Sequence, residues 1–222
     1  PSSSTNSGKG GSLARFAVAG DHLYTLKGQN LDVYNISNKN KLDKTSNKEI
    51  GFGAETIFPR DENTLFIGTT TGMYIYDISN GDNPEKRSHY EHVYSCDPVV
   101  ATEKYAYVTL NSLRPRCNRA RNLLKVIDIS NLDNPKEISE RAMEGPNGLG
   151  VDSNTLFVCD KNGLKVFDVS SPHNVQLRDH FNQVQGKDVI TLDNHVIIIA
   201  ENQLVQYEYT GNSISKISEL PY

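Results

Sequence analysis

The sequence has no tryptophan, only three cysteines and no apolar run long enough for a membrane-spanning helix. Three cysteines are too few for a small fold framed by disulfides. The formal net charge of the 222 residues is −4, from 23 basic and 27 acidic side chains, so no strong field of one sign selects nucleic acid or an anionic membrane. The 11 tyrosines and 7 phenylalanines supply the large apolar side chains of a sizeable core.

The first eleven residues differ in composition from the rest of the chain. Residues 1–11 read PSSSTNSGKGG, which offers too little apolar surface to offset the entropy of ordering, so we expect a flexible tether there. The composition stays even over residues 12–222 and predicts a single domain. No secretory signal is visible. Because the first residue is Pro1 and not Met, we expect that the chain has been trimmed.

One short motif recurs along the chain. Its clearest form is GMYIYDISN at residues 72–80, an apolar strand followed by a carboxylate, a β-branched residue, a hydroxyl and an amide. The equivalent marker positions are Asn35, Asp77, Asp128, Asp168 and, weakly, Glu208. Successive markers lie 42, 51, 40 and 40 residues apart. A period near 40 is typical of a four-stranded propeller blade.

Each repeat divides into four short segments of decreasing hydrophobicity. The second and third are apolar on both sides of the strand, as where Met73 and Ile75 point one way and Tyr74 and Tyr76 the other. Such strands need cover on both faces, whereas the half-polar fourth segment suits an outer edge. Radial stacking meets both needs. The sequence therefore predicts an all-β fold, a five-bladed β-propeller with four antiparallel strands per blade. We expect each marker carboxylate to accept N–H bonds from the turn that follows.

These units resemble LVIVD-repeat proteins, in which two hydrophobic residues precede Asp, Ile or Val, Ser, and Asn or Ser, with a proline soon after. The resemblance covers residues 13–220 and is best in the second to fourth units; the first has Asn35 in place of Asp, and the last reads Glu208-Tyr209-Thr210. It implies a propeller of the bacterial cell envelope, often a lipoprotein, without general catalytic activity. Membrane contact would then come only through an N-terminal lipid anchor outside this chain. The resemblance transfers no functional residue.

The third unit carries a long insertion that explains its period of 51 residues. Residues 111–122 connect its second and third segments and hold four arginines: Arg114, Arg116, Arg119 and Arg121. Arginine suits bidentate recognition of carboxylate, phosphate or sulfate. The alternative is a solvated loop whose arginines pair with nearby acids.

Inner strands of a propeller begin on the rim that carries this insertion. The polar residues at those starts are Glu55, Asp97, Asn147 and Lys187. Polar groups that converge on a channel mouth predict a ligand site. The alternative is a wet channel that is merely lined with polar residues.

The cysteines and histidines allow few arrangements. Cys96 and Cys117 fall on the same side of the third blade, so they either form a disulfide that holds the long loop or stay as two thiols. Cys159 is expected to be a small buried hydrophobe. The six histidines show no zinc spacing. His92 near Asp97 and Glu55 is the nearest approach to a metal site; we expect no metal and no cofactor.

We predict a non-enzymatic scaffold of the cell envelope that binds a protein, a peptide or an acidic glycan on the rim with the arginine-rich loop, and no nucleic acid. One alternative is a hydrolase or lyase acting on a carbohydrate or lactone at the channel mouth, although no G-x-S-x-G nucleophile motif is present. A third is a purely structural module of a larger assembly, which predicts an apolar exposed patch on one face.

Overall fold

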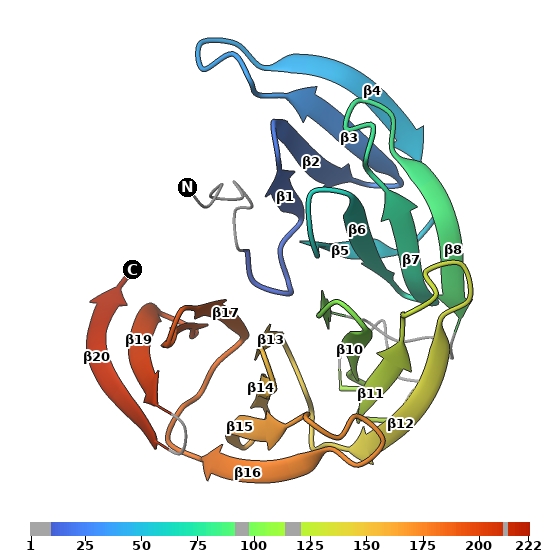
Figure 1. Cartoon of the computed structure of the whole chain (residues 1–222). Coiled ribbons are helices and arrows are strands. Elements are labelled where there is room, and N and C mark those ends of the chain that lie inside the picture. The colour runs from blue at the N-terminus through green and yellow to red at the C-terminus, as the bar shows by residue number, and fades with distance from the viewer. Residues whose placement is uncertain (1–9, 92–97, 114–120, 211–212) are drawn as a thin grey trace, which may run out of the picture.

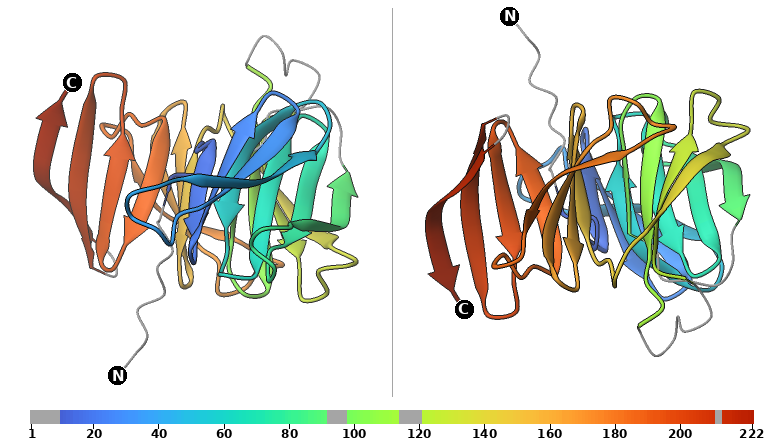
Figure 2. Two further views of the ribbon diagram at one scale, coloured as in Figure 1. Left: turned by 90° about the horizontal axis from the view of Figure 1, so that it is seen from above. Right: turned by 90° about the horizontal axis from the view of Figure 1, so that it is seen from below.

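The computed structural model describes residues 10–91, 98–113, 121–210 and 213–222. In this part of the chain there are twenty strands and no helix, and hence no helix that could cross a membrane. The strands form five four-stranded antiparallel sheets arranged about a common axis (Figure 1). The structure is the predicted five-bladed β-propeller. Edge-on views show the sheets standing side by side in a flat disc (Figure 2).

Within each blade the strands follow one another in chain order. Blade 1 holds β1 (Phe16–Ala19), β2 (His22–Lys27), β3 (Asn30–Asn35) and β4 (Asp43–Glu49). Blade 2 holds β5 (Ala54–Pro59), β6 (Thr64–Thr69), β7 (Gly72–Asp77) and β8 (Glu85–Glu91). Blade 3 holds β9 (Val99–Ala101), β10 (Tyr105–Leu110), β11 (Leu123–Asp128) and β12 (Lys136–Ala142). Blade 4 holds β13 (Leu149–Asp152), β14 (Thr155–Asp160), β15 (Gly163–Asp168) and β16 (Gln176–Phe181). Blade 5 holds β17 (Asp188–Leu192), β18 (His195–Ile199), β19 (Gln203–Thr210) and β20 (Ser213–Pro221).

The marker residue ends the third strand in blades 1 to 4 and fixes the next turn. Asp77 Oδ1 accepts bonds from the backbone N and the hydroxyl of Ser79, at 2.9 and 2.6 Å. Asn35 accepts the same two bonds from Ser37. The Ser79 hydroxyl holds the pKa of Asp77 below its ordinary value. The repeated carboxylate is therefore a local turn device, as predicted.

A second feature recurs one step before the marker. In every blade the pairing of the third strand with the fourth shifts by one residue, for example between Ile75 and Tyr76 and between Gln206 and Tyr207. A bulge of this kind bends and twists the strand that carries the extra residue. Because blade 5 has this bulge although Glu208 replaces the aspartate, it is a true fifth repeat.

The core consists of four apolar clusters, one between each pair of successive blades. The third residue of the second strand supplies a large aromatic side chain to each cluster: Tyr24, Phe66, Tyr107 and Phe157. All four are at most 1% exposed. We call the side of a blade that carries this residue its forward face, and the opposite side its back face. Each cluster joins the forward face of one blade to the back face of the next.

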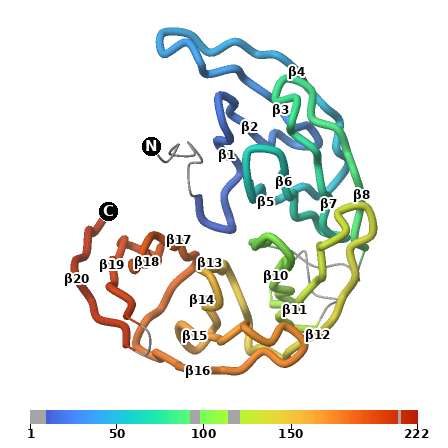
Figure 3. The backbone as a smooth tube through the Cα atoms, viewed as in Figure 1, coloured from blue at the N-terminus to red at the C-terminus, as the bar shows by residue number. Residues whose placement is uncertain are grey.

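The ring is open between blade 5 and blade 1, as the ribbon and the tube show (Figures 1 and 3). The expectation that every sheet is covered on both sides is correct for blades 2 to 4. It is wrong for the forward face of blade 5 and the back face of blade 1, because no further blade lies between them among the described residues.

The segment before β1 joins the two ends of the ring near the axis. Ser12 Oγ donates to Asp188 Oδ1 at 2.9 Å and accepts from Leu149 N at 2.8 Å, and Leu13 N donates to Asp188 Oδ2 at 2.9 Å. Gly11 is buried, and a Cβ there would overlap the Asp188 carboxylate. Of the predicted tether, residues 1–9 lie outside the described part of the chain.

Candidate functional site

The predicted rim site is described only in part. Six residues named for the rim or for the disulfide, together with His92, lie outside the described residues: Cys96, Asp97, Arg114, Arg116, Cys117 and Arg119. The predicted Cys96–Cys117 pairing therefore stays a prediction. The rim residues that the structure describes are Glu55, Arg121, Asn147 and Lys187.

Arg121 closes the long blade 3 connection and is highly exposed. Its side chain is 76% exposed, and Nη2 lies 3.0 Å from Glu140 Oε1 on β12. Lys125 Nζ on the neighbouring strand lies 2.6 Å from Glu137 Oε2 and 3.7 Å from Glu140 Oε2. An exposed ion pair of this kind is screened by water and contributes little to stability. The guanidinium of Arg121 therefore remains accessible to an anionic partner.

Both ends of the long connection are fixed by side-chain hydrogen bonds. Asn122 Oδ1 accepts from the backbone N and the hydroxyl of Ser112, at 2.8 and 3.0 Å. Asn111 Nδ2 donates to Pro146 O at 2.7 Å and reaches Asn147 Oδ1 at 3.3 Å. The predicted site residue Asn147 thus helps to join the connection to blade 4. The base of the insertion is therefore held by side-chain hydrogen bonds on both sides.

Lys187 lies beside a polar pocket on the same rim in blade 5. The pocket has a volume of 480 Å³ and is lined by residues 185–187 and 200–203. The Lys187 side chain is 57% exposed, with Nζ 3.6 Å from Glu201 Oε1. The backbone of Lys187 is held at both sides, since its O accepts from Gly148 N at 2.9 Å and its N donates to Ile199 O at 2.7 Å. A fixed backbone with an exposed ammonium group can present positive charge to a ligand in this pocket.

Two buried carboxylates lie close to this rim, and both hold the backbone. Asp160 accepts from Lys165 Nζ at 2.6 Å and from the backbone N of Gly145, Lys161 and Glu144, at 2.7, 2.9 and 3.2 Å. Burial raises the pKa of Asp160, but these bonds outweigh burial and keep the pKa below its ordinary value.

Asp188 shows the opposite balance. Burial raises the pKa of its carboxyl above the ordinary value, although bonds from Leu13, Val189 and Ser12 favour the ionised form. Both oxygens of Asp188 already accept hydrogen bonds from the chain. The sequence did not indicate this role, because the partners Ser12 and Leu13 lie 176 and 175 residues away.

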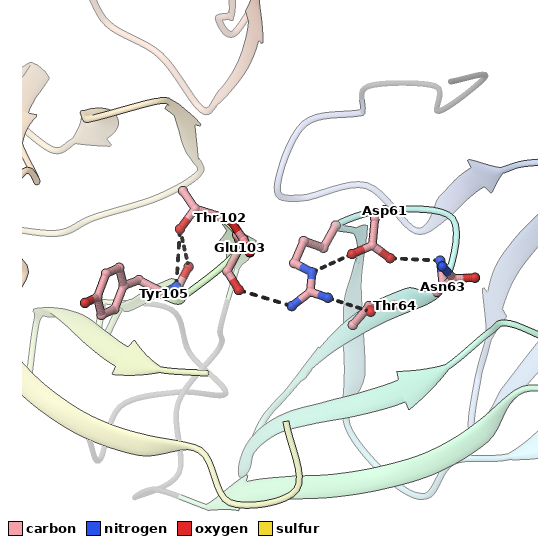
Figure 4. Close-up of polar contacts among 7 residues, drawn as sticks. Asp61, Asn63, Thr64, Thr102, Glu103 and Tyr105 are labelled. Carbon is pink, nitrogen blue, oxygen red and sulfur yellow. Dashed lines mark hydrogen bonds and ion pairs between the residues drawn. The ribbon is translucent and has the colours of Figure 1, made fainter. Parts of the chain in front are cut away.

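The opposite mouth of the channel holds a residue that sequence reasoning missed. Arg60 lines a cavity of 170 Å³ with apolar residues of the inner strands of blades 2 to 5. Its guanidinium donates to Asp61 Oδ2 at 2.7 Å, to Thr64 Oγ1 at 2.9 Å and to Glu103 O at 3.4 Å (Figure 4). A single arginine in a short polar turn gave no signal in the sequence.

Cys159 and the possible metal ligands complete the residues considered in the sequence analysis. Cys159 is a free, fully buried thiol, and burial raises its pKa well above the ordinary value. The prediction that it is a small buried hydrophobe is confirmed. Among the described residues, no three His, Cys, Asp or Glu side chains are grouped so that they could hold a metal ion.

Comparison with known proteins gives a repeat type for part of the chain and a fold. The LVIVD repeat model matches residues 119–141 and 148–182. No curated protein matches the sequence.

The solved structures most useful for comparison are all distant in sequence. A functionally unknown protein from Desulfotomaculum acetoxidans is 13% identical with a TM-score of 0.73, covering 94% of this chain and 69% of that one. A putative 6-phosphogluconolactonase from Bacteroides fragilis is 10% identical with a TM-score of 0.70, covering 93% and 69%. The periplasmic gluconolactonase of Pseudomonas aeruginosa is 10% identical with a TM-score of 0.69, covering 91% and 68%.

At such identities the structural likeness shows the fold alone. The family match adds the repeat type, because the matched residues include the third and fourth strands of blade 3 and all four strands of blade 4. The chain is a five-bladed β-propeller that matches the LVIVD repeat in its third and fourth blades.

Proposed function

We propose that this protein is a non-enzymatic binding scaffold of the bacterial cell envelope. Its ligand is a protein, a peptide or an acidic glycan that docks on the rim formed by the long blade 3 connection and the blade 5 pocket. Arg121 and Lys187 supply exposed positive charge on that rim, and Arg114, Arg116 and Arg119 add to it in the sequence. Complementary charge would speed the encounter and select anionic partners.

One observation carries the preference for binding over catalysis. The two buried carboxylates nearest the rim, Asp160 and Asp188, accept hydrogen bonds from the chain on both oxygens. General acid–base catalysis requires a group within hydrogen-bond reach of the substrate proton. These two carboxylates instead hold backbone segments in place, which is a structural role.

The rim charges can be tested by replacing all four arginines of the loop with serine. We expect the intact protein to bind immobilised heparin and a poly-glutamate peptide at about 50 mM salt and to release them near the ionic strength of plasma. The variant with Arg114, Arg116, Arg119 and Arg121 replaced should lose at least about tenfold in affinity. Its melting temperature should stay within about 2 °C, because exposed charges contribute little to stability.

The matched control removes the same charge from the opposite rim. Lys39, Lys41, Lys104 and Lys136 are all exposed and lie in or beside the turns of that rim. Their replacement with serine should leave binding to both probes within about twofold. Equal losses in the two variants would mean that net charge, and not the arginine loop, governs binding.

A lactone hydrolase is the second candidate, favoured by two observations. Two structural neighbours carry the names putative 6-phosphogluconolactonase and gluconolactonase, and Arg60 lies in the central cavity where it could meet an anionic sugar. Hydrolysis of 6-phosphogluconolactone and gluconolactone by the protein and by Arg60→Gln decides between the candidates. The scaffold proposal expects no rate above spontaneous hydrolysis. A catalysed rate in the wild type that Arg60→Gln abolishes would favour the lactone hydrolase over the scaffold.

A further inference from the structure

The interfaces between successive blades share the same apolar residue positions and the same orientation of the two faces. The forward face of a blade offers the third residue of its second strand, such as Phe66 or Phe157. The back face of the following blade offers the second and fourth residues of its own second strand, such as Val196 and Ile198. Every interface in the described chain joins a forward face to a back face, so each face predicts the kind of face that covers it.

The forward face of blade 5 is apolar near the axis and has no covering blade in the described chain, although Gln206 lies opposite Ile197 where the other blades have Val or Ile. Ile197 occupies the position of Phe157 in the repeat, and pairing places it opposite Ile190 on β17. Ile199 pairs with Leu204 on β19 in the same way. These four aliphatic side chains are only partly buried, whereas Val196 and Ile198 on the back face are each 1% exposed.

The back face of blade 1 lies across the open sector and is also uncovered. Phe16 on β1 is 64% exposed, and its neighbours on this face, Val18 and Leu23, pair with each other and are partly buried. Further out, Lys44 Nζ on β4 lies 2.7 Å from Asp32 Oδ1 on β3. The face is therefore apolar near the axis and polar toward the outer strand.

A groove separates the two faces close to the axis. It has a volume of 590 Å³. Its lining comes from β1, from Gly10, Gly11, Leu13 and Ala14 before it, and from Lys187, Asp188, Ile190 and Ile199 of blade 5. Its lining is mainly apolar. Beyond this groove the two blades diverge, so the sector widens toward the outer strands (Figures 1 and 3).

The solved propellers of similar fold are longer than this chain. This chain covers 69% of the Desulfotomaculum acetoxidans protein and 72% of a protein from Lactobacillus plantarum, with a TM-score of 0.69. The uncovered remainder of those chains corresponds to about 80 to 95 residues, or about two repeats of the present spacing.

We propose that the open sector is a docking surface for a partner made of two further four-stranded blades of the same repeat type. The first blade places an aliphatic back face on Ile190, Ile197 and Ile199. The second places a forward face on Phe16, Val18 and Leu23. This docking surface meets the rim that the proposed function concerns only at Lys187, which lines both the groove and the blade 5 pocket. An apolar exposed face is also what a module of a larger assembly was expected to show.

The chain itself provides a two-blade probe, because residues 143–222 contain blades 4 and 5. The test fuses a second copy of this segment after Tyr222 and compares the fusion with the 222-residue protein. We expect the melting temperature to rise by at least about 5 °C and the fluorescence of bound 1-anilinonaphthalene-8-sulfonate to fall severalfold. Amides of β17 to β19 in the original blade 5 should exchange at least about tenfold more slowly.

Two variants make the result specific to the proposed face. Ile197→Lys in the original blade 5 should abolish all three gains in the fusion. Leu177→Lys, at an exposed position on β16 outside the sector, should preserve them.

Two outcomes would overturn the proposal. The first is a fusion whose dye binding, amide exchange and melting temperature equal those of the 222-residue protein. This result counts against the proposal whether the added blades fail to dock or fail to fold. The second is a 222-residue protein that light scattering shows to be a dimer and that does not bind the dye, because a second copy would then occupy the face.

Discussion

Strands β14 and β18 are the same element of the repeat, yet their burial differs. All six residues of β14, TLFVCD, are buried, whereas β18, HVIII, alternates between partly buried and buried. The sequence of β18 is no less apolar than that of β14. The difference arises because β14 has a blade on each side and β18 has a blade on one side only. A strand that is apolar on both faces is therefore fully buried only where a blade packs on each side of it.

The largest effect expected from this comparison comes from truncating the equivalent residue in the two strands. Phe157→Ala should lower the free energy of unfolding by about 4 kcal/mol, since it empties a fully buried position between blades 4 and 5. Ile197→Ala should cost about 1 kcal/mol, because its side chain is already partly in water. Urea unfolding of both variants measures the contrast. Equal losses would show that the forward face of blade 5 is covered in solution.

Asp160 in blade 4 and Asp188, which joins the ends of the ring, allow a second comparison, that of two buried carboxylates with opposite pKa shifts. Asp160→Asn should cost roughly 3 kcal/mol at pH 7, because Lys165 loses its buried carboxylate partner. The pKa of Asp160 is lowered by folding, so its contribution is present above the unfolded pKa and disappears as the pH falls through the folded value. The cost of Asp160→Asn should therefore shrink between pH 5 and pH 3.

Asp188 should show the opposite pH dependence. Folding raises the pKa of Asp188, so the stability that it contributes is complete below the unfolded pKa and declines as the pH rises through the folded value. The free energy of unfolding of the wild type, relative to that of Asp188→Asn, should consequently increase as the pH is lowered from 7 to 4. Chemical unfolding at several pH values tests both variants, and parallel pH profiles would refute the assigned environments.

The smallest effect concerns the turn marker, for which blade 1 provides a natural control. Asp77→Asn should leave stability at pH 7 nearly unchanged, because Asn35 makes the same two bonds with Ser37 that Asp77 makes with Ser79. Asp77→Ala should cost about 1 kcal/mol, since the Ser79 amide and hydroxyl lose their acceptor. Thermal unfolding distinguishes the two substitutions. A large loss in Asp77→Asn would mean that the charge, and not the bonding pattern, matters.

Local pattern made most of the fold predictable. Strand polarity, turn residues and the marker spacing are properties of neighbouring residues, so the five blades and the role of Asp77 followed from them. The bond between Ser12 and Asp188 did not, because it joins residues 176 positions apart and Ser12 directly follows the predicted tether. The opening of the ring was missed for a related reason: the number of repeats does not state how far around the axis they extend.

The candidate site was less predictable than the fold. Lys187 was expected on the rim from its position in the repeat, and in the structure it lines a pocket of 480 Å³. Asn147 was also placed there, but its side chain contacts Asn111 at the base of the insertion. Arg60 was missed because no motif surrounds it. Charge on a loop predicts an accessible surface, whereas the partners of each polar group depend on long-range packing.

Native-state hydrogen exchange of the 222-residue protein tests most directly the claim that neighbouring blades protect one another. We predict that amides of β6, β10 and β14 exchange most slowly, near the limit set by global unfolding, and that those of β18 and β19 exchange about 100-fold faster. Protection of β18 equal to that of β14 would contradict the account, because an uncovered forward face could not give it.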